Sequence, residues 1–150
     1  MTKINTITRA CIIVMAIMMV ASTLAITASA SVKDTSFSYS LTGGDNYKTA
    51  FREKENNSSC YMKCSSATGG YQARVYSGPR NACAVDCSGG YYYYFVQGNA
   101  RFMYNLVIER GYDIAAIFAT TYNNGTIASG VWSPDSVPQA GVLPGSDYLK

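Results

Sequence analysis

The sequence predicts an all-β domain, a small sandwich of about seven or eight antiparallel strands. Short runs of alternating apolar and polar residues recur along the chain, and clusters rich in glycine, asparagine and proline separate them. No long helical pattern follows residue 30. The alternative is a small α+β domain in which the ambiguous segments form helices.

The first 30 residues have the pattern of a signal peptide that is removed on export. Lys3 and Arg9 supply positive charge, and the sequence Ala-Ser-Ala at positions 28–30 matches a signal-peptidase site. The apolar run between them has about 16 residues, fewer than the about 20 of a stable membrane span. Cleavage after residue 30 is therefore favoured over an uncleaved helical anchor. We expect a secreted, extracellular protein with no stable membrane span after processing.

The expected organisation is a signal peptide over residues 1–30, a β-sandwich domain over 31–132 and a tail over 133–150. Proline and glycine are frequent in the tail, so we expect an extended strap or a frayed end there.

Regular alternation identifies the strands most clearly. Residues 35–41 alternate so that Phe37, Tyr39 and Leu41 share one face, and residues 71–76 alternate in the same way. Both runs end at glycine-containing turn signals. We therefore expect both to form half-buried strands.

A β-hairpin is predicted over residues 112–132, with the Asn-Gly dipeptide at 124–125 as its tip. Asn-Gly suits two-residue hairpin turns, because both turn positions need a positive φ. In the register that this tip sets, Phe118 lies opposite Val131.

Residues 100–110 fit two structures. Their aromatic and β-branched content and an alternation of apolar side chains favour a strand. The helical alternative rests on Asn99 and Gly111 as caps and on a spacing of four between Arg101, Asn105 and Glu109.

Four of the five cysteines remain once Cys11 leaves with the signal peptide, and they form two C-x3-C pairs: Cys60, Cys64, Cys83 and Cys87. Zinc sites and redox dithiols usually use C-x2-C, and the chain has no histidine. Export favours disulfides instead. Two antiparallel segments in one register would join Cys60 to Cys87 and Cys64 to Cys83, and a helical hairpin would give the same pairing.

The absence of histidine removes Ser-His-Asp triads, Cys-His pairs and the usual zinc and haem ligand sets. The acidic residues form no motif for glycoside hydrolysis or calcium binding. We therefore expect no catalytic residues, no metal and no cofactor, and predict that the protein is not an enzyme.

Ten basic and nine acidic residues remain without Lys3 and Arg9, so nothing in the net charge favours nucleic acid.

Tyrosine is the most distinctive residue type, with 13 in the chain, all after the signal peptide. Tyr91, Tyr92, Tyr93 and Tyr94 are consecutive, so in a strand they project alternately to two sides. One side is then a candidate aromatic surface for stacking on sugar rings or for a membrane interface. The alternative is that tyrosine is simply a good strand former.

The sequences ERGY at 109–112 and GVWSPDSV at 130–137, together with the signal peptide and the first strand, resemble a group of small secreted β-rich proteins of Gram-positive bacteria. Some of that group are near the lactococcin-type bacteriocins, which are small β-sandwiches. The resemblance implies a secreted role and no catalytic residues. Within 130–137, residues 133–136 read as a turn in which Asp135 and Ser136 bond backbone amides.

The leading interpretation is a secreted, non-enzymatic β-sandwich that interacts with the cell envelope or acts as a bacteriocin-like effector. Its partner is then an unknown extracellular one, with a component of the cell envelope as the candidate. The alternative is a secreted carbohydrate-binding module that uses its exposed tyrosines.

Overall fold

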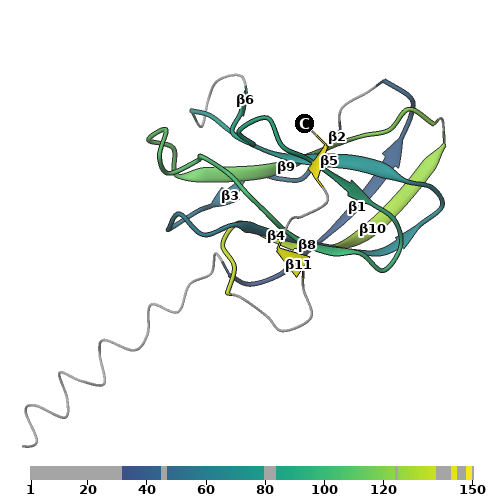
Figure 1. Cartoon of the computed structure of the whole chain (residues 1–150), viewed down its shortest axis with the longest axis horizontal. Helices are drawn as coiled ribbons and strands as arrows, with labels where there is room; N and C mark the ends of the chain where they lie inside the picture. The colour runs from purple at the N-terminus through teal and green to yellow at the C-terminus, as the bar shows by residue number, and fades with distance from the viewer. Residues whose placement is uncertain are drawn as a thin grey trace, which may run out of the picture.

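The computed structural model describes residues 32–44, 47–79, 84–123, 125–137, 143–144 and 148–149. These residues form strands in two sheets that pack face to face, with no helix among them (Figure 1). The prediction of an all-β sandwich is therefore confirmed. Seven of the described strands have four residues or more. The predicted signal peptide lies outside the described residues, which include no helix long and apolar enough to span a membrane.

The first sheet has five strands in the order β1-β10-β4-β8-β11. They are β1 (Thr35–Leu41), β10 (Thr126–Ser133), β4 (Cys60–Ala67), β8 (Ala100–Met103) and β11 (Leu143–Pro144). Neighbours are antiparallel, except that β11 pairs with β8 in parallel.

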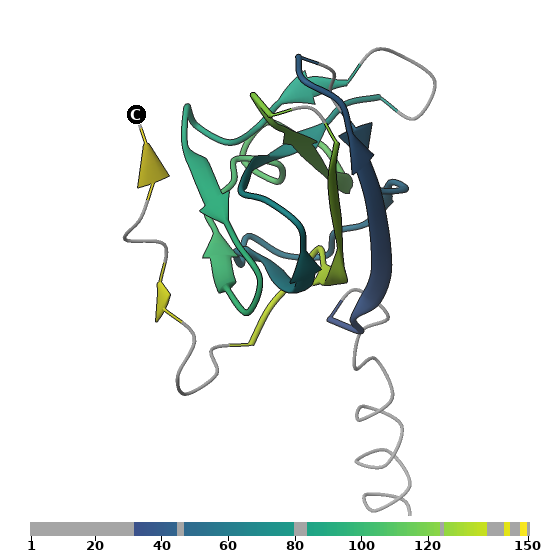
Figure 2. The same cartoon turned by 90° about the vertical axis from the view of Figure 1, so that its right-hand side faces the viewer.

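The second sheet has the order β12-β7-β5-β9-β2, with β6 also paired to β5 and β3 also paired to β9. The strands are β12 (Tyr148–Leu149), β7 (Tyr92–Phe95), β5 (Tyr71–Ser77), β9 (Ile114–Thr120), β2 (Tyr47–Lys48), β6 (Val85–Asp86) and β3 (Arg52–Glu53). Viewed from the side, the strands of the two sheets surround a common interior (Figure 2).

Alternating side chains from both sheets fill this interior, as expected for a sandwich. In β1 the buried residues are Phe37, Tyr39 and Leu41, so the face predicted from the sequence is confirmed. β5 alternates in the same way over its whole length. Trp132 of β10 is 1% exposed and is the largest fully buried side chain.

Gly130 lies where β10 and β4 come unusually close. The register between these strands shifts between Ser129 and Gly130, which marks a β-bulge. A Cβ added at Gly130 would lie 1.9 Å from the carbonyl oxygen of Lys63. Only glycine therefore fits at this point of the first sheet.

The hairpin predicted over residues 112–132 is wrong. β9 and β10 do not pair: β9 lies in the second sheet and β10 in the first. β9 has β5 on one edge and β2 and β3 on the other, while β10 lies between β1 and β4. Both strands are therefore hydrogen-bonded on both edges, and the chain passes from the second sheet to the first between them. Phe118 does not face Val131, since Phe118 pairs with Arg74 and Val131 with Ser36 and Lys63.

Residues 100–110 are a strand only over the four residues of β8. The helical alternative does not form, and turns follow instead, with Arg110 N–H donating to Leu106 O at 3.1 Å. Asn105 ends the strand, because its buried side chain donates to Ser58 O at 3.1 Å and accepts from Val107 N–H at 3.4 Å. A side chain that bonds the backbone two residues ahead favours a turn.

The sandwich extends past the boundary predicted at residue 132. β10 ends at Ser133, and the next two residues, Pro134 and Asp135, are fully buried. The short strands β11 and β12 then add to β8 and β7.

Candidate binding face

The outer surface of the second sheet carries a row of aromatic and basic side chains from four neighbouring strands. Arg74 of β5 pairs with Phe118 of β9, and Lys48 of β2 pairs with Phe118 from the other side. Beyond Arg74, the ring centroid of Tyr92 on β7 lies 4.6 Å from the guanidinium carbon. Tyr76 lies beside the row. We call the surface formed by Lys48, Arg74, Tyr76, Tyr92 and Phe118 the aromatic face.

The sequence of β5 explains how two of these side chains reach the surface. Successive side chains in a strand point to opposite sides. In β5 the residues on one side are buried, whereas Gln72, Arg74 and Tyr76 on the other side are partly exposed. The apolar residues thus direct β5 onto the core and leave a polar and aromatic set outside.

Stacking fixes the rings of the aromatic face. Tyr76 and Phe118 have ring centroids 3.9 Å apart and planes inclined by 19°. The Lys48 ammonium lies 5.9 Å from the Phe118 centroid and 5.3 Å from that of the neighbouring Phe51. Such cation–π contacts at partly exposed sites contribute about 0.5–1 kcal/mol.

Arg74 is held from several directions. Its guanidinium lies between Tyr92 and Tyr76, 5.0 Å from the Tyr76 centroid, and it donates hydrogen bonds to Asp86 Oδ2 at 3.0 Å and to the Tyr92 hydroxyl. The side chains of Arg74 and Asp86 are 20% and 36% exposed, so solvent weakens this ion pair. Burial raises the pKa of Tyr76, and the positive charge of Arg74 opposes this rise. The Tyr76 hydroxyl therefore keeps its proton at neutral pH.

The four predicted tyrosines divide as their alternation requires. Tyr93 is buried, and its hydroxyl accepts a hydrogen bond from Tyr104 N–H at 2.8 Å. Tyr91 packs edge-on against Tyr104, with ring centroids 5.4 Å apart. Tyr92 belongs to the aromatic face. Tyr94 is 46% exposed, and its hydroxyl lies over Gly70, where an added Cβ would be 1.8 Å away.

Sequence reasoning missed most of the aromatic face, because it lies on four strands that are distant in sequence. The alternation of residues 71–76 carried the signal for Arg74 and Tyr76. No local pattern placed Lys48 or Phe118, since their position depends on the pairing of β2, β9 and β5.

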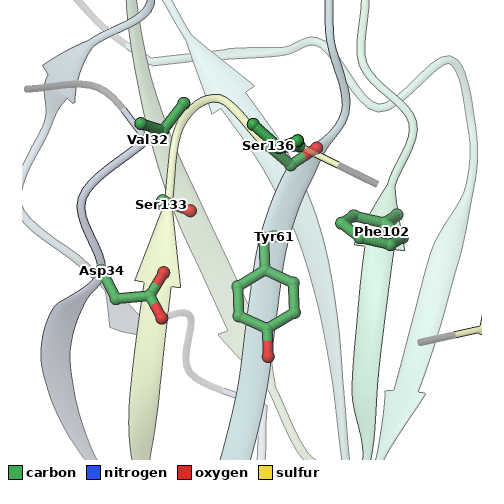
Figure 3. A pocket seen from close by; sticks show the side chains of 7 residues that line it. Val32, Asp34, Tyr61, Phe102, Ser133 and Ser136 are labelled. Atoms are coloured by element: carbon green, nitrogen blue, oxygen red, sulfur yellow. The ribbon is translucent and has the colours of Figure 1, made fainter. Parts of the chain in front are cut away.

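A small hollow of about 70 Å³ lies on the outer side of the first sheet (Figure 3). Its walls include the rings of Tyr61 and Phe102 on neighbouring strands, whose centroids are 5.7 Å apart. The other lining residues are Val32, Asp34, Ser133, Ser136 and Val137. Burial raises the pKa of Tyr61, and the charge of Asp34 raises it further. A hollow of this size is smaller than the usual binding cavities of small molecules.

Cys60 and Cys87 do not lie opposite each other in one antiparallel pair of strands. Cys60 begins β4 in the first sheet, whereas Cys87 follows β6 and its N–H donates to Val75 O of β5 in the second sheet. The register argument for the pairing is therefore wrong. Cys60, Cys64 and Cys87 are buried free thiols in this structure, and Cys83 lies outside the described residues.

Cys60 and Cys87 nevertheless both contribute to the hydrophobic core. Burial raises the pKa of the Cys60 thiol to about 12, with smaller electrostatic effects from Lys54, Asp135 and Cys87. The thiol is therefore protonated at neutral pH. Among the described residues, no group of three or more cysteine and acidic side chains could hold a metal ion.

Fold and surface together define a small two-sheet β-sandwich with a half-exposed aromatic face on one sheet. The chain belongs to the family described as "Protein of unknown function (DUF2712)", whose model matches residues 22–136. Comparisons with curated proteins and with solved structures give no match.

Proposed function

We propose that the protein is exported and binds polysaccharide of the cell envelope, without catalysis, through its aromatic face. The observation that carries this proposal is the row of Tyr92, Arg74, Phe118 and Lys48 across four strands. Aromatic rings can stack on the apolar faces of sugar rings. The polar groups beside them, Arg74 and Asp86, can bond sugar hydroxyls.

The arrangement favours an extended ligand over a small molecule. The aromatic face follows the surface of an open sheet, and the hollow on the first sheet is separate from it. The rings are only partly exposed and are interleaved with charged groups, so the surface suits a hydroxyl-rich ligand better than a lipid core. The ordered Tyr76–Phe118 stack reduces the entropy lost on binding.

Retention of the purified, processed protein on insoluble cell walls and on defined polysaccharides tests the proposal. We expect Tyr92→Ala and Phe118→Ala each to lower retention at least about tenfold. The reason is that each variant loses one stacking contact with the ligand, which is worth about 1.5 kcal/mol. The matched control is Tyr122→Ala, since Tyr122 is 87% exposed and lies outside the aromatic face. Lack of wild-type retention on every glycan, or equal loss in the control, would contradict the proposal.

The effector role rests on the sequence resemblance alone. A growth-inhibition assay with the wild-type protein and the same variants separates the two roles: inhibition that survives Tyr92→Ala supports an effector that acts independently of the aromatic face.

We also propose that the exported protein carries disulfides between Cys60 and Cys87 and between Cys64 and Cys83. The first would join the two sheets through the core, where both cysteines are buried. An oxidising compartment favours this chemistry. Alkylation under native and denaturing, non-reducing conditions should modify no cysteine, and peptide mapping should recover both pairs. Four modified cysteines in the denatured, unreduced chain would contradict this proposal.

A further inference from the structure

A lysine and an aspartate from opposite parts of the sequence meet in the interior, where neither side chain is exposed. Lys54 follows β3, and Asp135 lies two residues after the end of β10. The distance from Lys54 Nζ to Asp135 Oδ1 is 2.9 Å, and both side chains have a relative exposure of 0%. The pair joins residues 81 positions apart and lies outside the aromatic face.

Backbone groups surround both side chains. Lys54 Nζ donates to the carbonyl oxygens of Ser58 at 2.6 Å and Pro134 at 2.8 Å. Asp135 Oδ2 accepts a hydrogen bond from Glu55 N–H at 2.8 Å, and Oδ1 accepts one from Ser58 Oγ at 3.2 Å. Asp135, in the turn predicted at 133–136, thus accepts a hydrogen bond from a backbone amide, but this amide belongs to Glu55 in a distant segment.

The buried environment of Lys54 and Asp135 suits an uncharged amine and carboxylic acid as well as an ion pair. Removing two charges from water is costly, and transfer of one proton from Nζ to Oδ1 leaves an amine and a carboxylic acid. The two protons that remain on Nζ are held by the carbonyl oxygens of Ser58 and Pro134. The nitrogen lone pair, left by the transferred proton, then points at the carboxyl group of Asp135.

We propose that Lys54 and Asp135 condense to form an intramolecular isopeptide bond. Nζ attacks Cγ of the protonated carboxyl group, and the electron pair of the carbonyl bond moves onto Oδ2. Glu55 N–H lies 2.8 Å from this oxygen and stabilises its developing negative charge.

Collapse of the intermediate restores the carbonyl at Oδ2 and breaks the Cγ–Oδ1 bond. Oδ1 already carries the first proton of Lys54 and receives the second directly from Nζ, which lies 2.9 Å from it in the ion pair. It departs as water. The products are one secondary amide, with a single hydrogen on Nζ, and one water molecule, so no oxidant, reductant or cofactor is required.

Two features of the site favour the condensation. The reacting groups are held in contact by the fold, and such positioning corresponds to effective concentrations on the order of 10⁵–10⁸ M in well-oriented intramolecular reactions. The complete burial of both side chains keeps bulk water away from the amide that forms. The bond would tie the end of β10 to the segment between β3 and β4.

Mass spectrometry of the purified, processed chain tests this inference. After reduction and alkylation, the wild-type protein should have a mass lower by one water than the mass calculated from its sequence and observed N-terminus. A tryptic digest should contain a branched peptide that links Lys54 to Asp135, and trypsin should not cleave after Lys54.

Lys54→Arg is the informative variant, because a guanidinium keeps the charge and does not condense with the carboxyl group. It should have the full calculated mass. The matched control is Lys63→Arg on β4, an exposed lysine, which should still lack one water. If Lys54→Arg does not fold, the wild-type mass and the branched peptide decide alone. A folded wild-type protein with its full mass and normal cleavage after Lys54 would overturn the inference.

Discussion

Tyr76 of β5 stacks on Phe118 of β9 with ring centroids only 3.9 Å apart. The two residues are diagonal neighbours, since Phe118 pairs directly with Arg74 and Tyr76 with Ala116. Diagonal positions on a sheet are within reach of aromatic side chains. Arg74 is therefore bordered by the rings of Tyr76, Phe118 and Tyr92, and its guanidinium is presented in one orientation.

Replacement of Arg74 separates binding from stability. In Arg74→Gln the ion pair with Asp86 and the contacts with Tyr76 and Tyr92 are lost. Because the pair is partly exposed, we expect the free energy of unfolding in urea to fall by only about 1 kcal/mol. Retention on the polysaccharide that binds the wild-type protein should fall about tenfold, if one charged hydrogen bond to the ligand is lost.

Lys63→Gln is the control for this variant, because Lys63 is an exposed basic residue on the first sheet. It removes one positive charge, as Arg74→Gln does, and should leave retention unchanged. Equal losses in the two variants would mean that net charge, and not the aromatic face, governs binding.

The tyrosine run offers a direct test of its alternation. Tyr93→Ala should lower the free energy of unfolding by about 3–5 kcal/mol, because it empties a fully buried site. Tyr94→Ala should cost less than about 1 kcal/mol, since its ring is 46% exposed. Urea denaturation of both variants measures the difference. Similar losses would show that β7 does not place these two tyrosines on opposite sides.

Local pattern predicted the strands but not their partners. The alternation of residues 35–41 placed Phe37 in the core, because strand geometry alone fixes which side chains share a face. The Asn-Gly segment at 124–125 favours a tight reversal, but such a reversal can join strands of one sheet or of two. Here β5 occupies one edge of β9, and β1 occupies one edge of β10, so these edges are not available for a hairpin. Both β5 and β1 are distant in sequence from the turn.

The same limit applies to the candidate site. Alternation within residues 91–94 separates Tyr92 from Tyr93 without knowledge of the fold. The neighbours of Tyr92 depend on β7 pairing with β5 and β5 with β9, which are non-local contacts. Arg74 and Phe118 could therefore be located only in the folded chain. The cysteines show the same limit, because their matched spacing indicated one antiparallel pair, whereas Cys60 lies in the first sheet and Cys87 bonds to β5 of the second.

Gly130→Ala should be strongly destabilising, although it adds only one methyl group. The added Cβ would lie 1.9 Å from Lys63 O and 2.9 Å from Phe37 Cε1, so β10 and β4 must separate at the bulge. We expect a loss of about 3 kcal/mol or more in the free energy of unfolding. Ser129→Ala, at the adjacent position, should change it by less than about 0.5 kcal/mol. A Gly130→Ala protein as stable as the Ser129→Ala control would refute this close approach.

High pH should destabilise the reduced protein, because buried cysteine and tyrosine side chains are stable in the fold only while they keep their protons. Burial raises the pKa of Cys60 to about 12 in the folded state, from 9.0 for an unperturbed thiol. The unfolded chain therefore loses this proton first, so the stability due to the neutral thiol is complete below pH 9 and is lost as pH rises toward 12. Burial also raises the pKa of Tyr39 and of Tyr71, and both should add to the loss above pH 10.

Urea midpoints of the reduced protein at pH 8, 9, 10 and 11 would measure this decline. Cys60→Ala removes this thiol, whereas Cys64 and Cys87, whose pKa values burial also raises, still titrate. Its midpoint should therefore fall less between pH 9 and 11 than that of the reduced wild-type protein. In the oxidised protein none of the four cysteines has a proton to lose if both proposed bridges are present, so the decline should be smaller than that of reduced Cys60→Ala. A reduced wild-type protein with the same pH profile as Cys60→Ala would contradict the assigned burial of this thiol, because a group with equal pKa values in both states contributes no pH dependence.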